Sequence, residues 1–109
     1  MKVVGLFDKY TSEVFRFLGV ESFSLSPEDP NLSAKIIDYL EEFKKNKNIF
    51  SILISKNLSS KVRKELEEFA LNNTRPTVVE VDPMYNVEEY EDYEAIIKRI
   101  VRETIGIRL

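Results

Sequence analysis

Short apolar runs that alternate with segments of helical periodicity determine the class of fold open to this chain. Residues 2–8, 20–25, 49–55 and 77–81 are rich in aliphatic and β-branched side chains, and each run has the length of a single strand. A continuous apolar run of this length is typical of a strand buried on both faces, as in a parallel sheet. These runs therefore predict the strands of a sheet that is covered on both sides.

The segments between the runs carry apolar residues three and four positions apart, which is the spacing of an amphipathic helix. Helices are expected around residues 14–18, 32–43 and 58–70. Small polar residues that favour helix N-termini precede each segment, and glycine or polar residues follow it. The expected N-caps are Thr11 or Ser12, Asn31 and Asn57, and the expected ends are Gly19, residues 44–48, and Asn72 with Asn73.

The predicted elements follow the order β-α-β-α-β-α-β, which is typical of an α/β fold. Helices that join parallel strands cross over the faces of the sheet and cover them. We expect a four-stranded parallel sheet flanked by helices over residues 1–81, with the topology of half a Rossmann fold or of a receiver domain. A chain of 109 residues is long enough for one such domain with a modest core.

The last part of the chain has a different character. Residues 82–92 contain five acidic residues and no basic one, and we interpret them as an acidic linker. Residues 93–109 then carry an apolar stripe at helical spacing, and Lys98, Arg99 and Arg102 lie late in this segment, where the helix dipole favours cations. We therefore expect a C-terminal amphipathic helix whose stripe consists of Tyr93, Ile96, Ile97, Ile100, Val101, Thr104 and Ile105.

A helix of this length is marginal in water by itself, so its stripe must dock on another surface. One hypothesis is that Ile97, Ile100, Val101 and Ile105 bind a partner protein, and the alternative is that the helix covers a face of its own sheet. Arg16, between two phenylalanines, is a further candidate partner contact, with ordinary surface placement as its alternative.

Two residue types that carry much enzyme chemistry are absent. Without cysteine the chain has no disulfide, thiol nucleophile or thiolate metal site, and without histidine it lacks the commonest general base and metal ligand. The turn after the first run is Asp8-Lys9-Tyr10-Thr11, which has no glycine, although a dinucleotide or phosphate loop needs glycines there. We expect no catalytic site, no cofactor and no metal.

Charge and hydropathy bear on the partners. The net charge is −3 and no basic patch stands out, so nucleic acid is not an expected partner. No apolar run reaches the length of about 18 residues typical of a membrane span, and Asp8 interrupts the N-terminal run too early for a signal peptide. We expect a cytoplasmic protein that does not insert into a membrane.

Two chemical alternatives remain for the carboxyl edge of the sheet, where α/β proteins bind ligands. A receiver domain needs a phosphoacceptor aspartate after the third strand, but that strand ends in Ile54-Ser55-Lys56, which leaves only a degenerate receiver-like module. A small enzyme would have to use Asp8 and Ser55. The simpler interpretation of Asp8 is that it fixes the following turn or caps the first helix.

Two charged clusters have a simple interpretation as well. The acids of residues 88–92 could chelate a hard cation, but a solvated linker is the simpler explanation. The lysines of residues 44–47 are most simply a solvated helix end.

Motifs along the whole chain resemble those of one family. The segments MKVVGLFD, FRFLGV, IFSILISKNLSSKVRKEL, RPTVVEVDP and IIKRIVRETIGIRL resemble, in the same order and in a chain of the right length, segments of the F subunit of the rotary V-type/A-type ATPases. The chain departs from that family at Phe7, where glycine is frequent, and at residues 82–85, which replace a glycine-containing loop. The chain therefore resembles this family over nearly its whole length.

The resemblance implies a non-catalytic component of the central rotor stalk. Members of that family attach to the long coiled-coil D subunit of the rotor and turn inside the ring of catalytic A and B subunits, which couples ATP hydrolysis or synthesis to the transport of H⁺ or Na⁺. The C-terminal segment of the family is regarded as mobile and regulatory. The resemblance also implies a location in the soluble sector of the complex, peripheral to the membrane.

Overall fold

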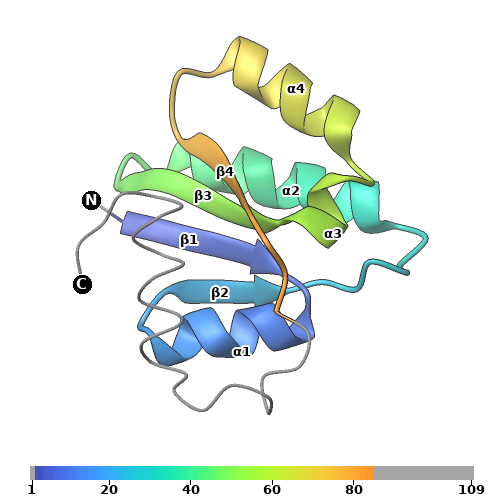
Figure 1. Ribbon diagram of the computed structural model, residues 1–109. Helices are drawn as coiled ribbons and strands as arrows, with labels where there is room; N and C mark the ends of the chain where they lie inside the picture. Colours follow the sequence, from blue (N-terminus) through green and yellow to red (C-terminus); the bar gives the residue numbers. More distant parts are fainter. Residues whose placement is uncertain (1, 85–109) are drawn as a thin grey trace.

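The computed structural model describes residues 2–84 of the chain, so the predicted C-terminal helix and most of the acidic linker lie outside the described residues. At least one helix lies between each strand and the next along the described part (Figure 1). The elements are β1 (Lys2–Phe7), α1 (Lys9–Phe17), β2 (Glu21–Ser24), α2 (Leu32–Lys45), β3 (Ile49–Ser55), α3 (Lys56–Ser59), α4 (Arg63–Asn72) and β4 (Thr77–Val81).

The four strands form one sheet in the order β2-β1-β3-β4, and every neighbouring pair is parallel. β1 and β3 are the central strands, and each is paired on both sides. Most residues of β1 and β3 are buried. This burial follows from their central position, because a strand covered on both faces has few side chains that reach water. The predicted four-stranded parallel sheet of an α/β fold is confirmed.

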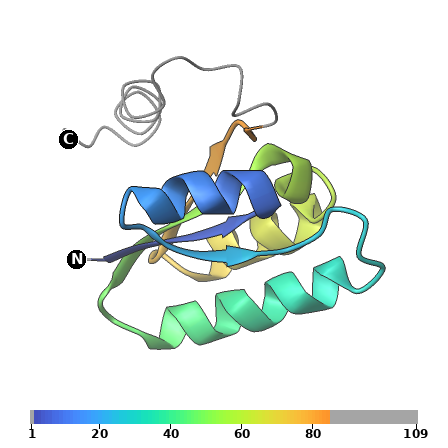
Figure 2. The same cartoon turned by 90° about the horizontal axis from the view of Figure 1, so that it is seen from below.

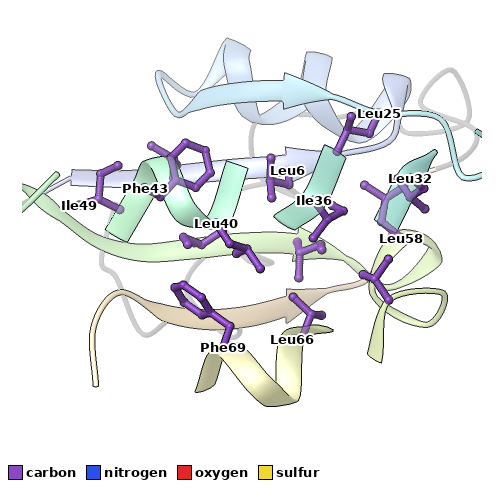
Figure 3. Packing of buried hydrophobic residues seen from close by; sticks show 14 residues of the cluster. Leu6, Leu25, Leu32, Ile36, Leu40, Phe43, Ile49, Leu58, Leu66 and Phe69 are labelled. Atoms are coloured by element: carbon purple, nitrogen blue, oxygen red, sulfur yellow. The ribbon is translucent and has the colours of Figure 1, made fainter. Parts of the chain in front are cut away.

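Helices cover the two faces of the sheet unequally. Figure 2 shows α1 and α2 on opposite faces with the strands between them. The larger core lies on the side of α2 and α4, where Ile36 and Leu40 of α2 and Leu66 and Phe69 of α4 converge over the strands (Figure 3).

No helix within residues 2–84 is both long enough and apolar enough to cross a membrane.

The smaller core lies on the side of α1. Phe7 at the end of β1 stacks on Phe15 of α1 with ring centroids 4.6 Å apart. Gly5 makes room for this stack, because a Cβ at that position would lie 2.8 Å from Phe7 Cδ2 and closer still to two other ring atoms. Met84, beyond β4, is buried in the same core.

The predicted helix over residues 58–70 is wrong in one respect, because the chain forms two helices there. α3 ends at Ser59 and α4 begins at Arg63, with Val62 in a non-helical conformation between them. Serine competes with the helical backbone through its hydroxyl, and Ser59 Oγ lies 3.4 Å from the Lys56 carbonyl oxygen. Leu58 and Val62 are both buried in the core on either side of this break, while Ala70, expected on the apolar face, is exposed.

Several helix caps in the structure also differ from the predicted ones. Neither Thr11 nor Ser12 caps α1, because Asp8 occupies that position, and Asn57 lies inside α3 with Ser55 before it. Asn31 is at the N-cap position of α2 as predicted, but its side chain makes no capping hydrogen bond. Gly19 follows α1 with φ of 86°, the left-handed conformation that glycine adopts without strain, so the predicted end of this helix is confirmed.

Candidate functional site at the carboxyl edge of the sheet

The carboxyl ends of β1 and β3 lie side by side, and the chain leaves them toward opposite faces of the sheet. After β1 it enters α1 on one face, and after β3 it enters α3 and then α4 on the other (Figure 1). Ligands of α/β proteins bind at such a switch point. Asp8 and Ser55, the residues an enzyme would need, meet there: the Asp8 main-chain N–H donates to Ser55 Oγ over 3.3 Å.

Each oxygen of the Asp8 carboxylate accepts a hydrogen bond at the start of α1. Its Oδ1 accepts the main-chain N–H of Thr11 over 3.1 Å, and its Oδ2 accepts the Thr11 hydroxyl over 2.7 Å. The first bond satisfies one of the N–H groups that a helix leaves without a partner in its first turn. The interpretation of Asp8 as a helix cap is therefore confirmed.

Thr11 links this cap to the segment that follows β4. Its Oγ1 accepts the main-chain N–H of Met84 over 2.9 Å while its hydroxyl hydrogen goes to Asp8. Thr11 is completely buried, and Met84 is 3% exposed. Beside it, the exposed Lys56–Asp82 ion pair, with 3.0 Å between Nζ and Oδ1, joins the ends of β3 and β4.

This geometry holds chain segments together and does not assemble a nucleophile. Ser55 is fully buried, and its hydroxyl contacts the main chain of Asp8, while the carboxylate faces Thr11. A nucleophile–base pair needs the base within hydrogen-bond reach of the hydroxyl, and no such bond joins these two side chains in the described part of the chain. The position that holds the phosphoacceptor in a receiver is likewise a buried serine.

A metal site or a ligand-binding hollow is a further kind of site that this edge of the sheet could hold. Residues 2–84 contain no group of three or more Asp, Glu, His or Cys side chains placed to hold a metal ion. Surface hollows flank the turn between α2 and β3, and another lies between α2 and α4. None of these three hollows includes Asp8, Thr11 or Ser55.

Arg16 is the one predicted partner contact that the structure describes. It lies exposed at the end of α1, and its Nη2 donates to the Ser22 carbonyl oxygen over 2.8 Å. This bond ties α1 to the outer strand β2, so part of the side chain has a structural role. The other predicted contacts, Ile97, Ile100, Val101 and Ile105, lie outside the described residues.

The roles of Thr11 and Met84 at this edge were not predicted, since Thr11 was expected as a cap of the first helix and Met84 as part of the linker. The spacing of Asp8 and Thr11 offered a signal, because a helix N-cap bonds to the residue three positions later. Met84 offered none, since its partner is 73 positions away in the sequence.

The family model described as the ATP synthase (F/14-kDa) subunit matches residues 2–100. A comparison with curated protein sequences gave no significant match. The family match spans the whole described domain and agrees with the motifs that resemble the F subunit of V/A-type ATPases. The chain therefore belongs to the ATP synthase (F/14-kDa) subunit family.

Proposed function

We propose that the chain is a non-catalytic component of the central rotor stalk in a V/A-type rotary ATPase. In this role it binds the coiled-coil subunit of the rotor, turns inside the ring of catalytic A and B subunits, and helps couple ATP hydrolysis or synthesis to ion transport. It is then a peripheral part of the soluble sector of the complex on the cytoplasmic side. The family match supports membership of such a complex.

The observation that carries the non-catalytic part of this proposal is the closed polar network at the carboxyl edge. Both oxygens of Asp8 accept hydrogen bonds from Thr11, and the Thr11 hydroxyl oxygen is occupied by Met84. These groups have their partners within the fold, so a substrate would have to displace protein hydrogen bonds in order to use them. The nucleotide chemistry of the complex then belongs to its other subunits.

The proposed binding element is the C-terminal helix of residues 93–109. Ile97, Ile100, Val101 and Ile105 form one apolar stripe in the sequence, and burial of such a stripe drives helix association. The described chain ends at Met84, which is anchored at the first turn of α1. The helix is therefore connected to a fixed point on the domain by the short segment 85–92.

A charge placed in the stripe tests this proposal. Ile100→Asp puts a carboxylate where an apolar side chain would be buried, and this substitution should weaken binding to the coiled-coil subunit about tenfold or more. Ala95→Asp adds the same charge to the opposite side of the predicted helix, so it should bind like the unmodified chain. Isothermal titration of the full-length variants with the purified coiled-coil subunit measures both. Binding of Ile100→Asp at the unmodified affinity would contradict the proposed role of the stripe.

A further inference from the structure

One of the hollows beside the turn between α2 and β3 is lined by cations from two distant parts of the chain. It has a volume of about 420 Å³, and its lining includes Lys44, Lys47 and Arg75, the last from the loop between α4 and β4. The two segments meet because β3 and β4 are neighbours that begin at the same edge of the sheet, where Ser51 pairs with Thr77 (Figure 1). No acidic residue of the described chain lines this hollow.

The end of a helix accounts for the lysines but not for the arginine. The last carbonyl groups of α2 carry partial negative charge, which favours Lys44 and Lys47 at this position without any ligand. Arg75 belongs to a separate segment, and the fold brings it to the same hollow although like charges repel each other. Cations that converge from separate segments create a positive potential, which a bound anion relieves.

The three cations differ in how far acidic residues already neutralise them. Lys44 Nζ lies 2.9 Å from Glu41 Oε2 in an exposed ion pair on α2, and exposed pairs of this kind are weak. Within residues 2–84, neither Lys47 nor Arg75 forms an ion pair with an acidic residue. Most of the positive charge of this hollow is therefore available to a ligand.

The guanidinium of Arg75 is positioned by an aromatic ring. Its Cζ lies 4.9 Å from the centre of the Phe50 ring, in a cation–π contact. Phe50 belongs to β3 and lines the same hollow, so the contact fixes the guanidinium against the sheet. A donor group that is already held in place loses less conformational entropy when it binds a ligand.

The hollow on the other side of the same turn lacks this excess of positive charge. Lys2 and Lys45 line it, but Glu21 and Glu42 line it as well. Lys2 is also paired directly with Glu21. Of the two hollows at this turn, only the one that contains Arg75 is lined by cations without acids among the described residues.

We infer that the hollow lined by Lys44, Lys47 and Arg75 binds a polyphosphate anion, either free or as part of a nucleotide. Arginine forms paired hydrogen bonds to phosphate oxygens, and lysine binds phosphate as a point charge. Several cations around one hollow suit a small ligand with several negative charges, and its volume lies in the range of roughly 300–1,000 Å³ that is typical of small-molecule sites.

This anion site lies at the amino edge of the sheet, whereas the network of Asp8 and Thr11 lies at the carboxyl edge. The chain can have the site whether or not it acts in a rotor stalk, because the residues that form it all belong to the described domain.

Isothermal titration of sodium tripolyphosphate into the full-length chain at about 0.1 M salt tests the anion site. The unmodified chain should bind one anion, and Lys47→Gln/Arg75→Gln should bind it about tenfold or more weakly, because two charge-assisted contacts are lost. Lys9→Gln/Lys64→Gln is the matched control, since it removes the same charge from two exposed lysines outside the hollow. The control should stay within about twofold of the unmodified affinity, because exposed charges away from the site are largely screened.

Two results of this titration would overturn the inference. The first is that the unmodified chain does not bind tripolyphosphate. The second is that both double variants lose affinity equally, since the net charge of the chain alone would then explain the binding. A short polyglutamate peptide that binds more tightly than tripolyphosphate would identify an acidic protein segment as the ligand, and it would overturn the inference as well.

ATP in place of tripolyphosphate distinguishes the two sources of the phosphate groups. Tighter binding of ATP would support a nucleotide as the ligand, because the nucleoside then adds contacts of its own. Equal or weaker binding of ATP would support a free polyphosphate.

Amide NMR of the unmodified full-length chain locates the anion without any substitution. Tripolyphosphate should shift the signals of residues 44–50 and 75–77, because these segments surround the hollow. Shifts centred on Asp8 and Thr11 would place the anion at the carboxyl edge and would overturn the inference.

Discussion

The Thr11 hydroxyl connects parts of the chain that are far apart in sequence. It donates to Asp8 at the end of β1 and accepts from Met84 beyond β4, and all three residues are buried. A buried donor that loses its acceptor keeps its full desolvation cost, so the cost of breaking this link exceeds the net contribution of one ordinary hydrogen bond.

Thr11→Val keeps the volume of the side chain and removes both bonds of the hydroxyl. We expect the free energy of unfolding to fall by about 1–3 kcal/mol, because the Met84 N–H and one Asp8 oxygen lose their partners. Urea unfolding measures this change, and hydrogen exchange should show the Met84 amide exchanging faster. Thr74→Val, at an exposed position between α4 and β4, is the control and should change stability by less than about 0.5 kcal/mol. Equal stability of Thr11→Val and the unmodified chain would contradict the role given to the hydroxyl.

Single residues were predicted well where the signal was local. Gly19 ends α1, and Asp8 serves as a cap, the simpler of its two interpretations. Thr11 and Ser12 were wrong as caps because the helix begins earlier, directly after β1, where Asp8 already supplies the oxygen. The sequence offered several suitable polar residues in a row, and only the position of the strand end decides among them.

At the scale of elements, the start of α2 is organised differently from the prediction. Asn31 makes no capping bond, but Asp29 accepts the Asn31 main-chain N–H over 2.8 Å and also bonds to the Lys35 ammonium. The hydrogen bond from Lys35, followed by that from Asn31, holds the pKa of Asp29 below its ordinary value of 3.8. The Asp29 carboxylate thus bonds to the main-chain N–H of the N-cap residue, whereas a capping side chain would bond to an N–H in the first turn of the helix.

Lys35→Met should raise the pKa of Asp29 toward 3.8, because it removes the larger of the two causes. A depressed pKa in the folded state stabilises the fold above the pKa of the unfolded chain, and this contribution is lost as the pH falls through the folded pKa. Carboxyl-carbon NMR titration measures the midpoint, and Asn31→Ala, which keeps the main-chain N–H, should leave it unchanged. An unchanged midpoint in Lys35→Met would rule out the role of the ammonium.

The strands were the elements predicted most closely. The predicted ranges 49–55 and 77–81 coincide with β3 and β4, because continuous apolar runs bounded by polar residues have few other structures open to them. The helix over residues 58–70 was predicted whole because its apolar period runs on through Leu58, Val62 and Leu66. The break between α3 and α4 depends on how those side chains meet the sheet, and periodicity alone does not contain that information.

At the scale of the whole molecule, the order of elements predicted the parallel α/β sheet, and motifs along the chain predicted the family. Neither the order of elements nor the motifs predicted contacts between residues far apart in the sequence. Met84 was assigned to the acidic linker, but it is buried against α1. This burial could not be predicted, because the residues that surround Met84 come from distant parts of the sequence. The meeting of Arg75 with Lys44 and Lys47 also depends on the pairing of β3 with β4, which only the fold defines.

Purification of the tagged full-length chain from its own cells, with identification of the proteins that accompany it, tests the central claim most directly. Membership of the ATP synthase (F/14-kDa) subunit family and the proposed stalk role predict that the coiled-coil subunit of the rotor and the catalytic A and B subunits are recovered with it. The Ile100→Asp variant, treated in the same way, should recover less of each. Recovery of the unmodified chain without any component of a rotary ATPase would contradict the account.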